Sequence, residues 1–245
     1  NADDGFQLDA DELMQATRGA KALLINTPHN PTGAVYSRKT LEAIAAACVA
    51  NDLWLISDEV YDSQIHEGEH VSPRSLPGMA ERTMVVGSMS KSHVMTGFRL
   101  GWVVADRSVI LAMRDLANAT TYGVPGFIQQ AAETALVDGD EEQARTGARY
   151  KRRRDIAVGV LGGSNAVRIS PPDGAMYVML DLRALGVTGE EFALRLLAEQ
   201  KIAVMPGESF GDVAAGFVRV ALTVADDELT NSLTRLRKFA EGFAK

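Results

Sequence analysis

The chain has 245 residues, of which 46% are hydrophobic, and a formal net charge of −7 at pH 7. Such a chain can form one large or two small globular domains with a sizeable core. Its negative charge argues against a general nucleic-acid-binding protein, because such proteins neutralise phosphates with an excess of Lys and Arg. No apolar run is long enough to span a bilayer. The single cysteine, Cys48, excludes an intrachain disulfide and favours a reducing, cytoplasmic location.

The first half of the chain has the pattern of a mostly parallel sheet. Short apolar runs without alternation, typical of strands buried on both faces, occupy residues 22–26, 53–57 and 83–87. Between the first two runs, Ser37 can cap an amphipathic helix that continues to residue 50, which predicts a βαβ unit. A further strand at residues 100–105 and a helix at residues 125–137 follow.

The second half, from Glu141 onward, predicts a different arrangement. A long helix is followed by strands at residues 167–170 and 176–181, and Thr188 and Glu191 form a capping-box pattern that begins a helix ending near Lys201. Two more strands and a terminal helix are expected; they cover residues 202–205, 217–223 and 226 onward. The basic run at residues 149–154 is interpreted as a solvated helix face or a subunit contact.

Four motifs carry polar groups, and the first two place theirs at or just beyond the end of a short apolar run. They are residues 26–33 (NTPHNPTG), 57–61 (SDEVY), 88–91 (SMSK) and 97–102 (GFRLGW). Together they resemble the fold-type I, pyridoxal 5'-phosphate (PLP)-dependent aminotransferases of the class I/II family, and the resemblance extends to a late FVRV motif at residues 217–220.

The resemblance implies an α/β fold of the PLP-dependent transferase type. Residues 1–140 are expected to form the C-terminal part of the PLP-binding large domain, with a mostly parallel sheet. Residues 141–245 are expected to form a smaller α+β C-terminal domain. The chain resembles a piece of the family that lacks an N-terminal segment, and the family's homodimers with shared active sites are expected here too.

In this resemblance Lys91 and Asp58 carry the chemistry. Lys91 matches the lysine that holds the PLP aldehyde as a Schiff base and then serves as general base and acid. Asp58 matches the carboxylate that faces the ring nitrogen and keeps it protonated, so that the ring can withdraw electrons. The position of Asp58 after an apolar run places it at the carboxyl end of a parallel strand, where α/β sheets bind ligands.

Further residues match the family's cofactor contacts. Asn30 and Tyr61 match the two donors to the phenolic oxygen of the ring, and Tyr61 counts among the catalytic residues. Ser88 and Arg99 match the phosphate-binding positions, with Ser90 as a third, because a hydroxyl and a planar guanidinium suit phosphate oxygens. Taken alone, Asn30 could also be a turn residue and Tyr61 a core residue.

Three residues are the candidates for substrate binding. Arg219 matches the family's clamp for the substrate α-carboxylate, on a strand of the small domain. Met176 lies in a segment that lines the substrate side chain, although a core position would fit it equally well. Tyr122 lies in the segment expected to reach the neighbouring subunit. No arginine stands at residues 119–122, where dicarboxylate-specific relatives supply one from the partner.

The predicted reaction is therefore transfer of the α-amino group of a neutral, aromatic or basic L-amino acid to a 2-oxo acid such as pyruvate. Residues 90–101, 174–180 and 205–211 are similar to arginine–pyruvate aminotransferases, with Glu208 or Asp173 as candidate partners for a cationic side chain. A PLP-dependent carbon–sulfur β-lyase and a non-catalytic aminotransferase-like regulatory domain stay open as alternatives. The four histidines show no metal-binding spacing, so no metal site is predicted.

Overall fold

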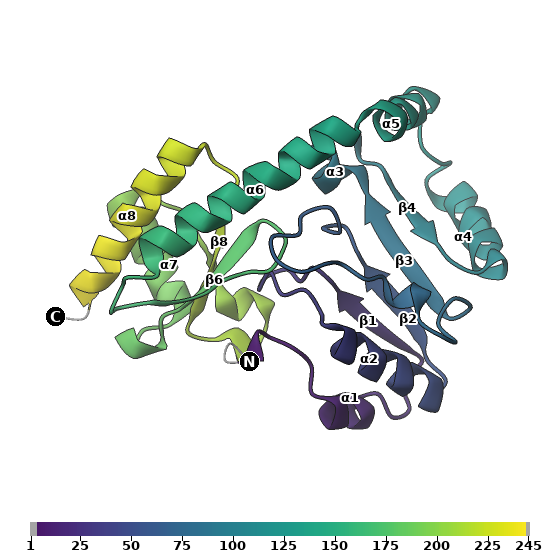
Figure 1. Cartoon of the computed structure of the whole chain (residues 1–245), viewed down its shortest axis with the longest axis horizontal. Coiled ribbons are helices and arrows are strands. Elements are labelled where there is room, and N and C mark those ends of the chain that lie inside the picture. Colours follow the sequence, from purple (N-terminus) through teal and green to yellow (C-terminus); the bar gives the residue numbers. More distant parts are fainter. Residues whose placement is uncertain (1–3, 244–245) are drawn as a thin grey trace.

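The computed structural model describes residues 4–243, which form two four-stranded sheets joined by a long helix (Figure 1). The first sheet contains β1 (Ala22–Asn26), β2 (Trp54–Asp58), β3 (Thr83–Ser88) and β4 (Gly101–Val104). The second contains β5 (Arg168–Ser170), β6 (Tyr177–Asp181), β7 (Met205–Pro206) and β8 (Phe217–Ala221). The α-helices are α1 (Ala10–Ala16), α2 (Arg38–Ala50), α3 (Met89–Ser92), α4 (Arg107–Thr120), α5 (Gly126–Asp138), α6 (Asp140–Leu161), α7 (Gly189–Gln200) and α8 (Asp226–Phe243). Within residues 4–243, no helix is long and apolar enough to cross a membrane.

The first sheet has the order β1-β2-β3-β4, with the first three strands parallel and β4 antiparallel to β3. This confirms the mostly parallel sheet and the βαβ unit from β1 through α2 to β2. The register places Asn26 beside Asp58 and Asp58 beside Val86. The polar residues that end these strands therefore lie next to one another.

The α2 helix begins and packs as its sequence predicts. The hydroxyl of Ser37 accepts the backbone N–H of Thr40 at 3.2 Å, which satisfies one of the free donors of the first turn. Leu41, Ile44 and Cys48 are almost completely buried and pack with residues of β1 and β2 in one apolar cluster. In Figure 1, α1 and α2 lie together along one side of this sheet.

The second sheet has the order β5-β6-β8-β7, with every neighbouring pair antiparallel. Its largest apolar cluster includes Phe192, Leu196, Val218 and Leu236, from α7, β8 and α8. The predicted strand at residues 202–205 is wrong in extent, since pairing begins only at β7. This edge strand stops at Pro206, which has no backbone N–H to donate to a ladder. The domain division near residue 140 remains a prediction.

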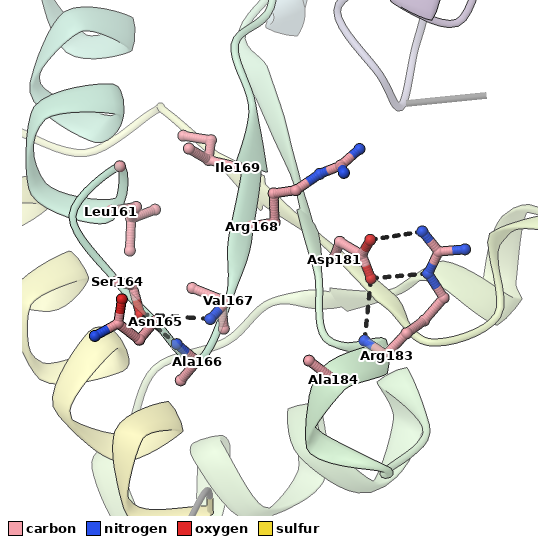
Figure 2. A pocket seen from close by; sticks show the side chains of 11 residues that line it. Leu161, Ser164, Asn165, Ala166, Val167, Arg168, Ile169, Asp181, Arg183 and Ala184 are labelled. Carbon is pink, nitrogen blue, oxygen red and sulfur yellow. Dashed lines mark hydrogen bonds and ion pairs between the residues drawn. The ribbon is translucent and has the colours of Figure 1, made fainter. Parts of the chain in front are cut away.

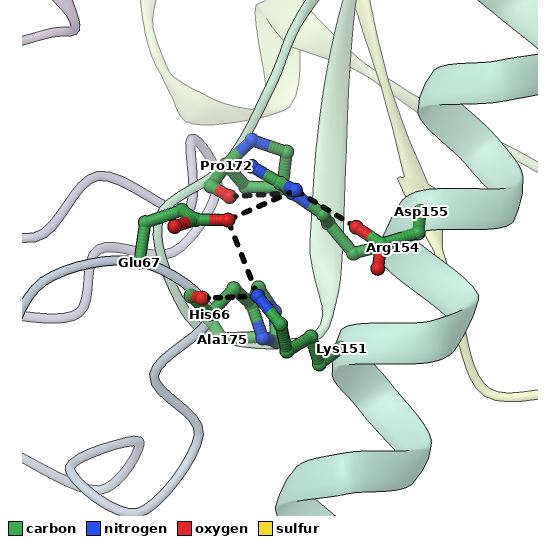
Figure 3. Close-up of polar contacts among 7 residues, drawn as sticks. All are labelled: His66, Glu67, Lys151, Arg154, Asp155, Pro172 and Ala175. Carbon is green, nitrogen blue, oxygen red and sulfur yellow. Dashed lines mark hydrogen bonds and ion pairs between the residues drawn. The ribbon is translucent and has the colours of Figure 1, made fainter.

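The basic run on α6 makes ion pairs within the chain, although Lys151 and Arg152 stay exposed on a solvated face. Arg152 and Arg153 both pair with Asp226 at the start of α8, at 2.5 and 3.0 Å. Arg153 is only 12% exposed. Lys151 and Arg154 reach the loop after β2 instead, where both pair with Glu67 (Figure 3). The α6 helix therefore ties the first sheet to the second.

Candidate active site

The carboxyl edge of the first sheet gathers the predicted polar side chains. Asp58 ends β2, Ser88 ends β3, and Asn30 lies in the loop after β1. Because β1, β2 and β3 are parallel, they end at the same edge. Arg99 precedes the antiparallel β4 and so arrives at this edge from the opposite direction. Ligand sites of open α/β sheets lie at such an edge.

Lys91 lies on α3, a single helical turn that directly follows β3. Ser88 accepts the N–H of Ser90 at 3.1 Å and so caps this turn. The Nζ of Lys91 lies 5.8 Å from the centroid of the Tyr61 ring. Gln64 donates from Nε2 to the backbone carbonyl of Lys91 at 3.1 Å. The loop after β2 thus supplies both the ring that faces the amine and a bond that fixes the helical turn.

The carboxylate of Asp58 is partly buried beside Lys91. Burial raises the pKa of this carboxyl, whereas the backbone N–H of Val60 and the positive charge of Lys91 act in the opposite direction. The N–H of Val60 reaches Asp58 Oδ1 at 3.2 Å. The side chain of Asn26 donates to the carbonyl of Asp58 at 2.9 Å and holds the end of β2 in place. A partly desolvated carboxylate is stabilised by any further cation placed against it.

Of the predicted phosphate-binding residues, Ser88 precedes α3, Ser90 lies on it and Arg99 follows it. Ser88 also donates to the carbonyl of Leu100, at 3.4 Å. Arg99 is exposed and donates to the carbonyl of Thr96 at 2.8 Å. Its backbone has a φ of 56°, a conformation that residues other than glycine rarely adopt and that is concentrated at functional sites. The predicted phosphate-binding roles of these residues stay predictions.

Arg219 comes from β8 of the second sheet and meets Asn30 of the first. Its Nη1 donates to Asn30 Oδ1 at 2.7 Å, and the backbone N–H of Asn30 donates to Asn26 Oδ1 at 2.6 Å. The guanidinium carbon lies 4.2 Å from the centroid of the Tyr177 ring and 5.0 Å from that of the Phe210 ring. Because Arg219 occupies the amide oxygen of Asn30, the amide nitrogen is the group that remains to donate to a ligand.

Tyr61 joins the two sheets through a second polar contact. Its hydroxyl lies 3.1 Å from the hydroxyl of Tyr177 on β6. Burial raises the pKa of the Tyr61 phenol, so that it keeps its proton and can donate. The amine, carboxylate, phenol, amide and guanidinium expected at Lys91, Asp58, Tyr61, Asn30 and Arg219 therefore form one connected set.

The other substrate-binding candidates lie in contrasting surroundings. Met176 is 6% exposed and belongs to a small apolar cluster with Tyr61, Ala175 and Tyr177. Tyr122 follows α4 and is 90% exposed in this chain. Its expected reach to a neighbouring subunit, and the substrate contact of Met176, stay predictions.

The two acidic candidates, Glu208 and Asp173, both make hydrogen bonds within the chain, Glu208 through its carboxylate and Asp173 through its backbone. Glu208 accepts the backbone N–H groups of Gly189 and Gly216 at 2.8 and 3.0 Å, so it stabilises loops of the second sheet. The backbone carbonyl of Asp173 accepts the N–H groups of His66 and Glu67 at 2.7 and 3.1 Å.

Two cavities lie outside this connected set. The first, about 620 Å³, lies between the end of α6 and the strands β5 and β6; Arg168, Asp181 and Arg183 contribute to its lining (Figure 2). Asp181 and Arg183 pair at 2.6 Å, which compensates both charges. The second, about 470 Å³, lies beside the Arg219 contact and shares Phe210 with it.

Sequence reasoning missed three residues that support the site. Gln64 is fully buried and bonds to the backbone of Lys91. His66 contacts the carbonyl of Ala175 through Nε2 at 2.8 Å. Asn26 bonds to both Asn30 and Asp58. Of these three residues, only Asn26 could have been found from the sequence, because it is a polar residue at the end of an apolar strand.

Comparison with known protein families shows which family this chain belongs to. The model described as aminotransferase class I and II matches residues 1–236. The chain belongs to the class I and II aminotransferase family. Members of this family use pyridoxal phosphate. The expectation of a fold-type I, PLP-dependent transferase fold is therefore confirmed.

Individual aminotransferases agree with this assignment. The chain is 44% identical over 236 residues to arginine–pyruvate transaminase of Pseudomonas aeruginosa, covering 96% of this chain and 60% of that protein. It is 39% identical over 237 residues to aspartate aminotransferase of Pyrococcus abyssi, covering 95% and 61%. An aromatic aminotransferase structure from Pyrococcus horikoshii superposes with a TM-score of 0.94 at 36% identity, covering 99% of this chain and 65% of that one. The chain thus spans about 60% of the length of the curated relatives it matches.

Proposed function

We propose that this protein is a PLP-dependent aminotransferase that moves the α-amino group of an L-amino acid to a 2-oxo acid. One observation carries the proposal. An amine, a carboxylate and a phenol from the loop edge of the first sheet lie in one connected set with a guanidinium from the second sheet. Lys91, Asp58 and Tyr61 supply the first three groups, and Arg219 supplies the fourth.

The residues present fit the cofactor that the family uses. The Asp58 carboxyl, partly desolvated by burial, suits a position against a protonated ring nitrogen. Tyr61 and the amide nitrogen of Asn30 are donors suited to a phenolic oxygen. Ser88, Ser90 and Arg99 supply hydroxyls and a guanidinium suited to phosphate oxygens, and the proposal assigns them to the phosphate. When bound, the cofactor supplies an electron sink for the bonds of the substrate Cα.

The residues of this chain then have distinct tasks. Lys91 would supply the amine that holds the cofactor and, once released, would move the proton from the substrate Cα to the cofactor carbon. Arg219 binds the α-carboxylate through its planar fork, which orients the Cα–H bond. Its Nε is buried and has no hydrogen-bond partner among residues 4–243, which leaves a donor for an incoming anion.

The proposed substrate is a neutral, aromatic or basic amino acid, with pyruvate as acceptor. The 44% identity to an arginine–pyruvate transaminase makes arginine the first amino acid to test. The proposal includes a homodimer, in which the exposed Tyr122 contributes to the neighbour's site. It also includes a cytoplasmic location, which the single buried cysteine, Cys48, supports.

The test uses the full-length protein with PLP. Arginine and phenylalanine are each incubated with pyruvate or 2-oxoglutarate, and alanine is incubated with 2-oxoglutarate; the new amino acid and 2-oxo acid are then quantified. In parallel, the protein is reduced with borohydride and the modified lysine is located by mass spectrometry. Lys91→Ala should abolish both transamination and the reduced adduct. Lys39→Ala, a change on the exposed side of α2, is the matched control and should leave both intact.

Three outcomes would contradict the proposal. The first is an adduct located at another lysine, and the second is transamination that survives Lys91→Ala. The third is release of pyruvate and ammonia from L-cystathionine without an acceptor, in a protein that transfers no amino group. This last result would identify a carbon–sulfur β-lyase.

A further inference from the structure

Tyr177 and Arg219 lie on the same face of the second sheet because of strand register. In the β6–β8 ladder Arg219 lies opposite Met179, two residues beyond Tyr177. Side chains two residues apart on a strand point to the same face, and diagonal neighbours on adjacent strands are within reach of long side chains. The ring of Tyr177 consequently lies 4.2 Å from the guanidinium carbon of Arg219.

The ring of Tyr177 gives the guanidinium of Arg219 a fixed platform. The ring of Phe210 lies 5.0 Å from the same carbon, and Asn30 accepts from Nη1. A guanidinium is attracted to the face of an aromatic ring, and this attraction grows when water is excluded. These contacts orient the guanidinium while its buried Nε keeps a free donor.

The hydroxyl of Tyr177 has a different neighbour. It lies 3.1 Å from the hydroxyl of Tyr61, and both tyrosines are buried, at 9% and 4% exposure. A phenol carries one proton, so in this pair one hydroxyl must donate and the other must accept. If Tyr177 donates, the proton of Tyr61 remains available for a third group. Donation into Tyr61 also strengthens the bond that Tyr61 then makes.

The backbone before Tyr177 is held rigidly. Ala175 has a φ of 61°, a left-handed conformation that costs an alanine free energy. Its N–H donates to the carbonyl of Gln64 at 2.8 Å, and its carbonyl contacts Nε2 of His66 at 2.8 Å. A Cβ on Gly174 would lie 2.9 Å from the Gln64 carbonyl, so the segments are in close contact. Two bonds therefore fix the conformation from which Tyr177 projects.

We propose that Tyr177 is a positioning residue that aligns the cofactor-facing phenol of Tyr61 with the carboxylate-binding guanidinium of Arg219. The proposal rests on the proposed aminotransferase function. Tyr177 acts through two separable groups. Its hydroxyl donates to Tyr61 and so strengthens PLP binding. Its ring supports Arg219 and so strengthens binding of the amino-acid substrate.

The first variant, Tyr177→Phe, removes the hydroxyl and keeps the ring. In the full-length enzyme the dissociation constant for PLP should rise about two- to tenfold, the range expected for one hydrogen bond. The visible absorbance of the bound cofactor should titrate at higher pH, because a weaker donor leaves the phenolic oxygen more basic. The KM for the amino acid should stay within about twofold. Tyr36→Phe, which removes the hydroxyl of another buried tyrosine, should change none of these.

The second variant, Tyr177→Leu, removes the ring as well. The KM for the amino acid should rise about five- to thirtyfold, because Arg219 loses its platform. A double-mutant cycle separates the hydroxyl contact from general loosening. In a Tyr61→Phe background, Tyr177→Phe should change PLP affinity by less than about twofold, because the contact is already gone.

Specific results would overturn the positioning role. One is a Tyr177→Phe enzyme with unchanged PLP affinity and unchanged titration. Another is a fully additive loss of PLP affinity when Tyr61→Phe and Tyr177→Phe are combined. A third is a folded Tyr177→Leu enzyme with the KM of the unmodified enzyme. If the unmodified protein neither binds PLP nor transfers amino groups, the proposed function itself fails, which is distinct from these results.

Discussion

His66 should make the protein lose stability as the pH falls below 6.5. Burial, together with the nearby charges of Arg154 and Lys151, lowers the pKa of His66 to about 4 from its ordinary value of 6.5. In its neutral form Nε2 donates to the carbonyl of Ala175, and the buried Nδ1 has no partner among residues 4–243. Protonation would place a second N–H at this Nδ1, close to two cations.

The change in the free energy of unfolding with pH follows from the difference between the pKa of His66 in the folded and unfolded chains. Above pH 6.5 the imidazole is neutral in both folded and unfolded chains. Between pH 6.5 and about 4 the unfolded chain takes up a proton that the folded chain does not, so the free energy of unfolding falls. One pKa unit corresponds to about 1.4 kcal/mol, which gives a loss of about 2 kcal/mol at pH 5 and about 3 kcal/mol below pH 4.

The assay compares urea unfolding of the unmodified protein and His66→Gln at pH 7 and pH 5. Glutamine keeps a side-chain N–H that can reach the Ala175 carbonyl but does not titrate. The unmodified protein should lose about 2 kcal/mol more than the variant between these pH values, or about 1 M in urea midpoint. Equal losses in the two proteins would refute the reasoning, because every other titrating group is common to both.

Four other substitutions test the packing and the site. Gly207→Ala should destabilise the protein by about 3 kcal/mol in thermal unfolding, because its Cβ would lie 2.0 Å from the carbonyl oxygen of Ala214. Gly159→Ala has open space on α6 and should instead stabilise it by about 1 kcal/mol; equal effects of the two would contradict this. Gln64→Leu removes the bond to the backbone of Lys91 and should lower PLP affinity about fivefold by equilibrium titration, with unchanged affinity as the contrary result. Arg219→Lys should raise the KM for the amino acid at least tenfold with a smaller change in kcat, and a KM within twofold would remove Arg219 from the clamp.

Local sequence signals predicted most of the fold. The β1 strand has the expected bounds, and α2 and α7 begin at the expected caps, Ser37 and Thr188. The helices α1 and α4 were missed. The α4 helix has no buried residue in this chain, so its formation cannot be inferred from packing on a core. The prediction at residues 202–205 failed because apolar character specifies burial but not which backbone groups pair.

The site was predictable in composition but not in connectivity. Strand ends placed Asp58 and Ser88 at one edge, since parallel strands must finish together. The contact between Tyr61 and Tyr177 joins residues 116 positions apart, and that between Asn30 and Arg219 joins residues 189 apart. Such contacts depend on how the two sheets are packed against each other, which no local pattern determines. The family motifs supplied the residue list, and only the structure supplied the partners.

The guanidinium and the phenol of the proposed site belong to different sheets, and each already has a partner on the opposite sheet. A ligand bound by both groups would therefore bridge the contact between the two sheets. Ligand binding should slow amide hydrogen exchange where the two sheets meet and protect the protein from proteases, even at residues that do not contact the ligand. Ligand binding would in this way stabilise the packing of the two sheets against each other.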